Sequence, residues 1–204
     1  MSLIKKKTVS EIEHLLENDI DWNSIKKPNK NNKGKRGQLL ELLLGIQNST
    51  SLTDLIDGEI KTYTFGQSIA QTQLLHFLDG IMNEIPFEDS KLGIKMKQEI
   101  YVCFSDKNEF KGTITLNDNK NPSHYLKLEE DYKFISKVIK KKIMNKGKLN
   151  TITGPNKLLQ IRTKASKNKK TGKYTPLIYD GHELQNKYMA FYLCSNFGKK
   201  LFNH

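Results

Sequence analysis

Residues 54–65, DLIDGEIKTYTF, run from a turn rich in carboxylates into a short segment of alternating side chains. This alternation predicts a β-strand with Glu59 and Lys61 on one face, because successive side chains of a strand point to opposite faces. Asp54 and Asp57 lie just upstream. Carboxylates grouped with an ammonium group in this way are what metal-assisted hydrolysis of a phosphodiester requires.

The chemistry of such a group follows from its donor atoms. Carboxylate oxygens hold hard divalent cations, and Mg²⁺ takes only one or two carboxylates besides water and phosphate oxygens. A neighbouring lysine can orient or deprotonate the attacking water and offset the charge on the phosphate. The alternative interpretation is a solvated strand edge with an ion pair worth less than about 1 kcal/mol.

The composition favours a protein that binds nucleic acid. The 204 residues suffice for one domain with a hydrophobic core, or one domain with two lobes. The 34 Lys and Arg residues outnumber the 22 Asp and Glu residues, giving a net charge of +12, although an AT-rich coding genome would also enrich lysine. This charge is typical of nucleic-acid binders. The absence of an apolar run of roughly 20 residues and of a signal peptide predicts a cytoplasmic protein without a membrane span.

The cysteines and histidines do not suggest a zinc site. Cys103 and Cys194 each lie in an apolar segment, and neither belongs to a Cys-x-x-Cys pair. Buried thiols are therefore expected. The five histidines are scattered along the chain and form no cluster in the sequence.

A predicted helix precedes the acidic stretch. Residues 38–45, QLLELLLG, form an apolar segment that ends at a glycine. Glu41 lies among its leucines, where a buried carboxylate is costly without a partner. Glu41 therefore faces water or meets a cation, and the helix could bring it against Glu59 and Lys61. The lysine-rich residues 26–37 indicate either a solvated linker or a phosphate contact.

The remaining sequence alternates between helical and extended patterns, which predicts an α/β fold. Residues 8–17 predict a helix capped by Ser10. Residues 91–104 indicate a basic turn that enters a strand, with Lys95 and Lys97 on one face. Further helices are expected at 71–82 and 125–144, and further strands at 113–116, 158–165 and 191–193.

The strand expected at 158–165 has a polar face made of Gln160, Arg162 and Lys164. An arginine and a glutamine on a rigid strand suit contacts with base edges and phosphates. The loop that follows is basic and contains Lys167, Lys169, Lys170 and Lys173. Basic residues therefore flank the acidic stretch on both sides in the sequence.

The order of these segments resembles MutH and the related GATC-cleaving type II restriction endonucleases, a family of the D…ExK nuclease superfamily. The resemblance covers nearly the whole chain. It is carried by KGKRGQLLE at 33–41, EIKT at 59–62, LQIRTKA at 159–165 and FYL at 191–193. It implies a restriction-endonuclease-like α/β fold, in which a mixed β-sheet is flanked by helices and two lobes form a basic cleft for DNA.

The resemblance also implies roles for residues of the acidic stretch. Asp54 and Glu59 would bind the catalytic Mg²⁺, and Lys61 would lie at the attacking water. Glu41 would belong to the same site, and Lys95 would be a second lysine close to the scissile phosphate.

Two assignments keep alternatives. The interval before Glu59 is shorter than in MutH, so Asp57 is the alternative to Asp54 as metal ligand. Arg162 and Lys164 match DNA-contacting residues, and Tyr192 matches the tyrosine near the adenine whose methylation MutH senses. A core position for Tyr192 and a phosphate contact for Arg162 are the alternatives.

The sequence thus predicts a single MutH-like endonuclease domain over residues 1–204. Its catalytic part is centred on residues 35–105, and its DNA-recognition part lies at residues 150–204. We expect a Mg²⁺-dependent type II restriction endonuclease that cuts duplex DNA at GATC as a monomer or a DNA-induced dimer, alongside a cognate methyltransferase. The alternatives are a mismatch-repair nicking endonuclease and a non-catalytic DNA-binding module.

Overall fold

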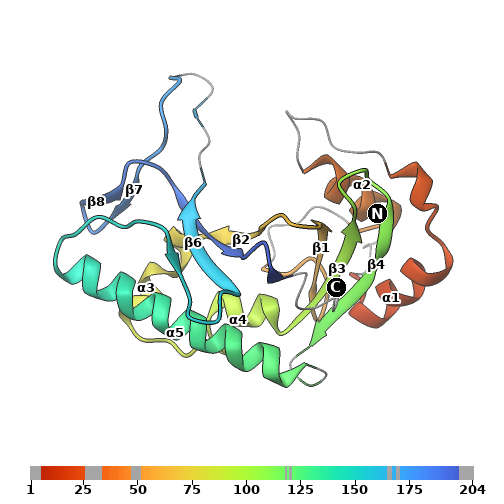
Figure 1. The fold of residues 1–204 in the computed structure, drawn as a ribbon, viewed down its shortest axis with the longest axis horizontal. Helices are drawn as coiled ribbons and strands as arrows, with labels where there is room; N and C mark the ends of the chain where they lie inside the picture. Colours follow the sequence, from red (N-terminus) through yellow and green to blue (C-terminus); the bar gives the residue numbers. More distant parts are fainter. Residues whose placement is uncertain are drawn as a thin grey trace. The chain divides into compact units, whose positions relative to one another are not determined.

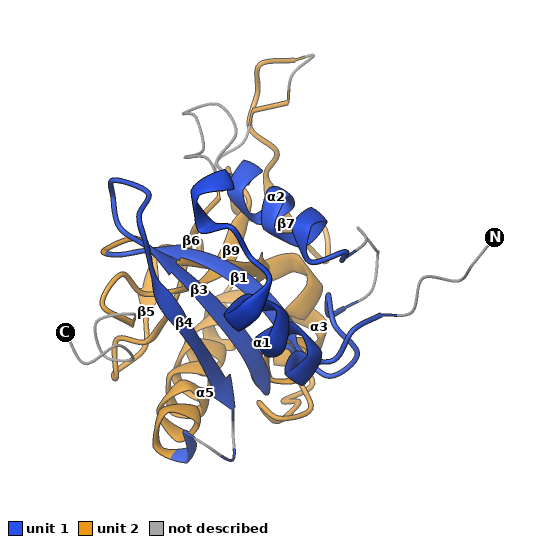
Figure 2. Cartoon of the chain, turned by 90° about the vertical axis from the view of Figure 1, so that its right-hand side faces the viewer, with its two compact units in different colours: residues 1–65, 95–122 blue, residues 66–94, 123–204 orange. Residues whose placement is uncertain are grey.

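The computed structural model of the chain describes residues 6–25, 34–46, 52–117, 119, 121–164, 167–168 and 171–197. It is a mixed α/β structure, as predicted, and the chain divides into two compact units (Figures 1 and 2). Unit 1 comprises Met1–Phe65 and Lys95–Pro122, and unit 2 comprises Gly66–Ile94 and Ser123–His204. Residues 66–94, which lie inside the range 35–105 predicted for the catalytic part, therefore belong to unit 2.

Within the described residues, unit 1 contains a three-stranded mixed sheet in the order β1-β3-β4. Strand β1 (Glu59–Thr64) pairs in parallel with β3 (Gln98–Phe104), and β4 (Phe110–Asn117) pairs with β3 in the antiparallel sense. The strands predicted at the acidic stretch and at 113–116 are confirmed.

The register of β1 and β3 decides which side chains meet. Glu59 lies opposite Glu99, and Lys61 lies opposite Tyr101. Because paired residues of neighbouring strands point to the same side of a sheet, these four side chains share one face. The other face carries apolar side chains and forms the core of unit 1.

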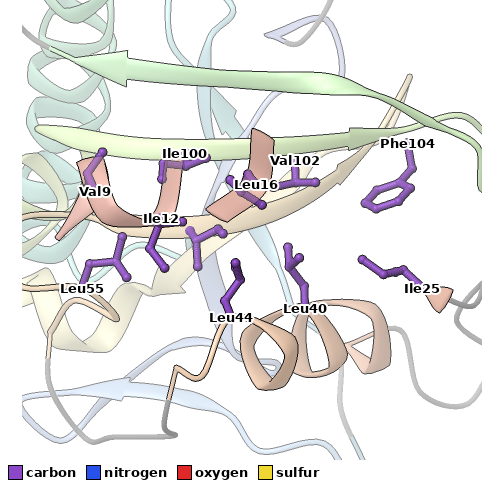
Figure 3. Packing of buried hydrophobic residues seen from close by; sticks show 11 residues of the cluster. Val9, Ile12, Leu16, Ile25, Leu40, Leu44, Leu55, Ile100, Val102 and Phe104 are labelled. Atoms are coloured by element: carbon purple, nitrogen blue, oxygen red, sulfur yellow. The ribbon is translucent and has the colours of Figure 1, made fainter. Parts of the chain in front are cut away.

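Helices α1 (Val9–Asn18) and α2 (Lys35–Leu43) pack on that apolar face. Their buried side chains interdigitate with those of β1 and β3 (Figure 3). Removing this apolar surface from water is the main stabilising contribution of the cluster. Its members include Val9, Ile12, Leu16, Leu40, Leu44, Ile60, Ile100, Val102 and Phe104.

The ends of these helices correct two details. Thr8, and not Ser10, caps α1, because Glu11 completes a capping box with Thr8. Helix α2 begins at Lys35, earlier than predicted. Its predicted termination by glycine is confirmed, since Gly45 follows the helix with a φ of 66°, a conformation that glycine adopts without strain.

Gly58 positions the start of β1 because it has no room for a side chain. A Cβ there would lie 2.5 Å from the Gln98 carbonyl oxygen and 2.5 Å from Val9 Cγ2. We expect Gly58→Ala to lower the free energy of unfolding by about 1–3 kcal/mol, because the backbone must move. Chemical denaturation measures this change. The control is Gly80→Ala, whose Cβ would approach nothing closer than 3.5 Å; equal midpoints for both variants would contradict the close packing at Gly58.

In unit 2, the described residues form a four-stranded antiparallel sheet in the order β2-β9-β6-β5 and a β7-β8 hairpin. The strands predicted at 158–165 and 191–193 correspond to β6 and β9 and are confirmed. Their bounds are Ile69–Gln73 for β2, Ile152–Thr153 for β5, Leu159–Thr163 for β6, Leu177–Tyr179 for β7, His182–Gln185 for β8 and Met189–Leu193 for β9.

The longest helix of the described chain, α5 (Pro122–Met144), confirms the helix predicted over 125–144. Its buried residues include Leu128, Tyr132, Ile135 and Ile139 at helical spacing. No helix in the described ranges combines the length and the apolar character that crossing a membrane demands.

Two predictions of secondary structure are wrong. Residues 71–73 belong to β2, which pairs with β9, and only then do a 3₁₀ turn (Leu74–Phe77) and the short helix α3 (Leu78–Met82) follow. Lys95 lies in helix α4 (Lys91–Met96), not on a strand face with Lys97.

Helix α4 forms at this position because a serine caps its N-terminus. The Ser90 hydroxyl accepts a hydrogen bond from the Gly93 N–H at 3.0 Å. A serine in this position satisfies one of the free N–H groups at the start of a helix. The remaining short element, the 3₁₀ turn Trp22–Ser24 in unit 1, begins after Asp21, whose side chain caps it.

Candidate active site

Glu59, the first residue of β1, is the centre of the charged cluster in unit 1. Its side chain is only 2% exposed. Lys61 Nζ donates to Glu59 Oε1, and Lys95 Nζ lies 3.0 Å from the same oxygen. Glu59 Oε2 accepts a hydrogen bond from the backbone N–H of Asp54 at 3.0 Å. Burial would raise the pKa of Glu59, but Lys61 and Lys95 lower it below its ordinary value, so Glu59 is an ionised buried carboxylate.

Two further carboxyl groups lie in the electrostatic field of Glu59. Burial and the charge of Glu59 raise the pKa of Asp54. Burial and the charge of Asp54 raise the pKa of Glu41 on α2, against the opposing effect of Lys61. Carboxylates that repel one another in this way are stabilised by a bound cation.

Lys61 balances part of this negative charge. Burial would lower the pKa of Lys61, but Glu59 and then Glu99 raise it above its ordinary value. Lys61 is therefore an ammonium group in this arrangement. It is suited to orienting a water molecule and neutralising a phosphate, more than to removing a proton.

The donor atoms of Asp54 and Glu59 fit a hard divalent cation such as Mg²⁺. Both side chains offer only oxygen ligands, and Mg²⁺ completes its shell with water and substrate phosphate. Across the described ranges, no group of three or more His, Cys, Asp or Glu side chains is arranged to hold a metal ion alone. A cation at this place would thus depend on water molecules and a phosphate oxygen for its remaining ligands.

Asp57, the alternative metal ligand, has structural partners. Asp57 Oδ1 accepts a hydrogen bond from the Val9 N–H at 2.8 Å. Asp57 Oδ2 lies 3.4 Å from Gln98 Nε2. Asp57 therefore secures the beginning of α1, and the arrangement favours Asp54 as the partner of Glu59.

Sequence reasoning missed Glu99 and Tyr101 on β3. Glu99 is fully buried, and Tyr101 donates its hydroxyl proton to Glu99 Oε2. Their alternation in QEIYVCF matches that of Glu59 and Lys61 in EIKTYT. Only the pairing of β1 with β3 shows that the two alternating pairs share one face.

Arg36 differs from its prediction. It lies in the lysine-rich residues 26–37, for which the sequence predicts a solvated linker or a phosphate contact, but its side chain is buried. Arg36 donates a hydrogen bond to Thr64 Oγ1 at 2.8 Å, and its Cζ lies 4.4 Å from the centre of the Phe104 ring. Arg36 thus joins α2 to the sheet. The preceding residues, 26–33, lie outside the described ranges.

In unit 2, the expected DNA-contacting residues of β6 and β9 lie on one face, called here the β6–β9 face (Gln160, Arg162 and Tyr192). The guanidinium carbon of Arg162 lies 4.4 Å from the centre of the Tyr192 ring, an attractive cation–π arrangement. Arg162 also donates to Ser68 Oγ at 3.3 Å, and Gln160 Nε2 lies 3.5 Å from the same atom. Arg162 is exposed, whereas Tyr192 is largely covered.

The expected basic loop after β6 is described in part. The backbones of Lys167 and Tyr174 form an isolated antiparallel β-bridge. Lys167 Nζ lies 5.5 Å from the centre of the Tyr174 ring. A second lysine, Lys187, places its Nζ 4.6 Å from the centre of the same ring. Lys164 is exposed at the end of β6. Two further expected contacts, Lys169 and Lys170, lie outside the described residues.

Asp131 on α5 holds the turn that leads into β6. It is fully buried. Asp131 Oδ1 accepts from the Asn156 N–H at 2.7 Å, and Oδ2 accepts from the N–H groups of Leu158 and Leu159 at 2.8 and 2.9 Å. Gly154 packs directly against this carboxylate. The start of the β6–β9 face is thereby fixed by a charge-assisted network.

No protein-family model matches the chain, and no curated protein gives a significant match.

Proposed function

We propose that the chain is a Mg²⁺-dependent endonuclease that hydrolyses phosphodiester bonds in duplex DNA. The observation that carries this proposal is the buried Glu59, whose carboxylate contacts the ammonium groups of Lys61 and Lys95 and the backbone of a second acidic residue, Asp54. The spacing of these residues resembles the D…ExK pattern. A protein that only binds DNA gains nothing from carboxylates placed against phosphates.

The side chains divide the work of hydrolysis. Asp54 and Glu59 would hold the cation, which when bound acts as a Lewis acid and activates water. Lys61 orients the attacking water and offsets charge that develops on the phosphate. Lys95 adds a second positive charge at the same carboxylate. Glu41 adds negative charge beside Asp54 and Glu59, which favours the binding of a divalent cation.

Duplex DNA is the proposed substrate. The net charge of +12 supports attraction to a polyanion, and binding should weaken steeply as salt rises because counterions are released from the duplex. The exposed Arg162 with Gln160 offers donors suited to base edges or phosphates. GATC is proposed as the target by the resemblance of LQIRTKA at 159–165 and FYL at 191–193.

Arg162→Ala should weaken binding to a GATC duplex by about tenfold or more, because one good bidentate contact discriminates by about 1–3 kcal/mol. Fluorescence anisotropy with a GATC duplex and a scrambled duplex measures this. A lower affinity for the GATC duplex alone indicates a base contact, and an equally lower affinity for both duplexes indicates a phosphate contact. The control is Lys111→Ala, which removes an exposed positive charge from unit 1. Unchanged binding of Arg162→Ala to both duplexes would contradict a role in DNA contact.

The proposed function is tested with plasmids that carry unmethylated, hemimethylated or fully methylated GATC sites. Purified protein is incubated with each plasmid in Mg²⁺, and the products are sized and their ends sequenced. Double-strand cuts at one short sequence support a restriction endonuclease and identify its site. Nicks confined to one strand support a mismatch-repair enzyme instead, and binding without cleavage would overturn the enzymatic proposal in favour of a DNA-binding module.

A further inference from the structure

We propose that Glu99 is a positioning residue for Lys61, and that Tyr101 holds the Glu99 carboxylate in place. This inference rests on the proposed nuclease function. It adds to the D…ExK pattern a buried carboxylate from the neighbouring strand β3.

The strand register brings the groups together. In the parallel pair of strands β1 and β3, Glu99 lies opposite Glu59 and Tyr101 lies opposite Lys61. Neighbouring strands lie roughly 4.8 Å apart, and paired side chains point to the same face. The Lys61 side chain therefore extends where both carboxylates, Glu59 and Glu99, are within its electrostatic reach.

Burial makes this arrangement energetically consequential. Glu99 is 0% exposed, and a buried carboxylate is costly unless it is hydrogen-bonded and compensated by a cation. Tyr101 supplies a hydrogen bond to Oε2 of Glu99. Lys61 supplies positive charge, since it is the diagonal neighbour of Glu99 across the β1–β3 pair and lies on the same face.

Glu99 gives Lys61 a second anionic neighbour besides Glu59. Glu59 contacts both Lys61 and Lys95, and by the proposed function it must also hold a cation. A cation bound there would weaken the attraction of Glu59 for Lys61. Glu99 keeps an anionic partner for Lys61, so the ammonium group stays where the attacking water and the phosphate need it.

Kinetics separate this role from a structural one. Glu99→Gln keeps the shape of the side chain but removes its charge. It should lower kcat for DNA cleavage by about ten- to hundredfold, the scale of a small misplacement of a catalytic group, with KM and the melting temperature unchanged. Glu99→Asp restores the charge and should retain more activity than Glu99→Gln. Tyr101→Phe should lower kcat less. Glu109→Gln, at an exposed ion pair with Lys111, is the control and should match the wild type.

A second measurement does not depend on cleavage. In ¹⁵N-lysine NMR spectra, the Lys61 ammonium group should give a narrow signal in wild-type protein, assigned by its absence in Lys61→Arg. Glu99→Gln should broaden this signal, and Glu109→Gln should not. If the wild type cuts no DNA but the signal behaves in this way, the positioning role stands and the proposed function fails.

The inference is overturned by either of two results. One is an unchanged Lys61 signal in Glu99→Gln. The other is a Glu99→Gln variant that cuts at the wild-type rate, or that loses activity only through a lower melting temperature or a higher KM.

Discussion

Lys61→Ala is expected to lower the rate of DNA cleavage by about a thousandfold, the scale of losing one preorganised group that stabilises developing charge. Lys61 is the ammonium group that contacts the buried Glu59 on the same face of β1. Without it, nothing from β1 orients the attacking water or offsets charge on the phosphate. Single-turnover cleavage of a labelled GATC duplex measures the effect.

The DNA affinity and the fold of Lys61→Ala must also be measured, so that a lower cleavage rate can be assigned to the chemical step. Lys61→Ala should bind DNA within a few-fold of the wild type, since a single phosphate contact contributes modestly to affinity. Circular dichroism should show an unchanged fold. Lys97→Ala removes an exposed lysine of unit 1 and should cut at the wild-type rate. Equal cleavage rates for Lys61→Ala and Lys97→Ala would contradict the role given to Lys61.

Asp131→Ala is expected to lower the free energy of unfolding by about 3–5 kcal/mol, because backbone N–H groups that bond to this buried carboxylate lose their acceptor. The substitution leaves the buried N–H groups of Leu158 and Leu159 without their acceptor and opens space beside Gly154. Each unsatisfied buried donor costs about 1–3 kcal/mol. Urea denaturation gives the change in free energy.

The neighbouring residue on α5 provides a matched control. Glu130 is exposed and accepts one hydrogen bond from Asn156 Nδ2 at 2.9 Å. Glu130→Ala should therefore cost less than about 1 kcal/mol. Amide hydrogen exchange of Leu158 and Leu159 should accelerate in Asp131→Ala. A midpoint shared by the two variants would show that Asp131 does not secure the turn before β6.

Several elements could be predicted because their patterns are strong and local. The apolar residues of α5 repeat at helical spacing, and β1, β6 and β9 show alternation or compact apolar runs. The adjacency of Glu59 and Lys61 follows from strand alternation alone. The structure brings Glu41, Asp54 and Lys95 within electrostatic reach of Glu59, and their catalytic roles stay predictions.

Other features depend on contacts that local patterns do not reveal. The place of Glu99 beside Glu59 requires the β1–β3 register, and the approach of Lys95 requires α4, whose start depends on a cap by Ser90. In the sequence, nothing distinguishes Asp131 from the neighbouring Glu129 and Glu130. Its importance arises from hydrogen bonds to a turn far along the sequence.

The cation dependence of cleavage in wild type and Glu59→Gln tests whether Asp54 and Glu59 hold a divalent cation for phosphodiester hydrolysis. Cleavage of a labelled GATC duplex is followed in Mg²⁺, in Mn²⁺ and with a chelator. We expect the wild type to cut with either cation and not with the chelator, and Glu59→Gln to cut with neither cation. A wild type that cuts nothing under any condition, or a Glu59→Gln variant that cuts at the wild-type rate, would contradict it.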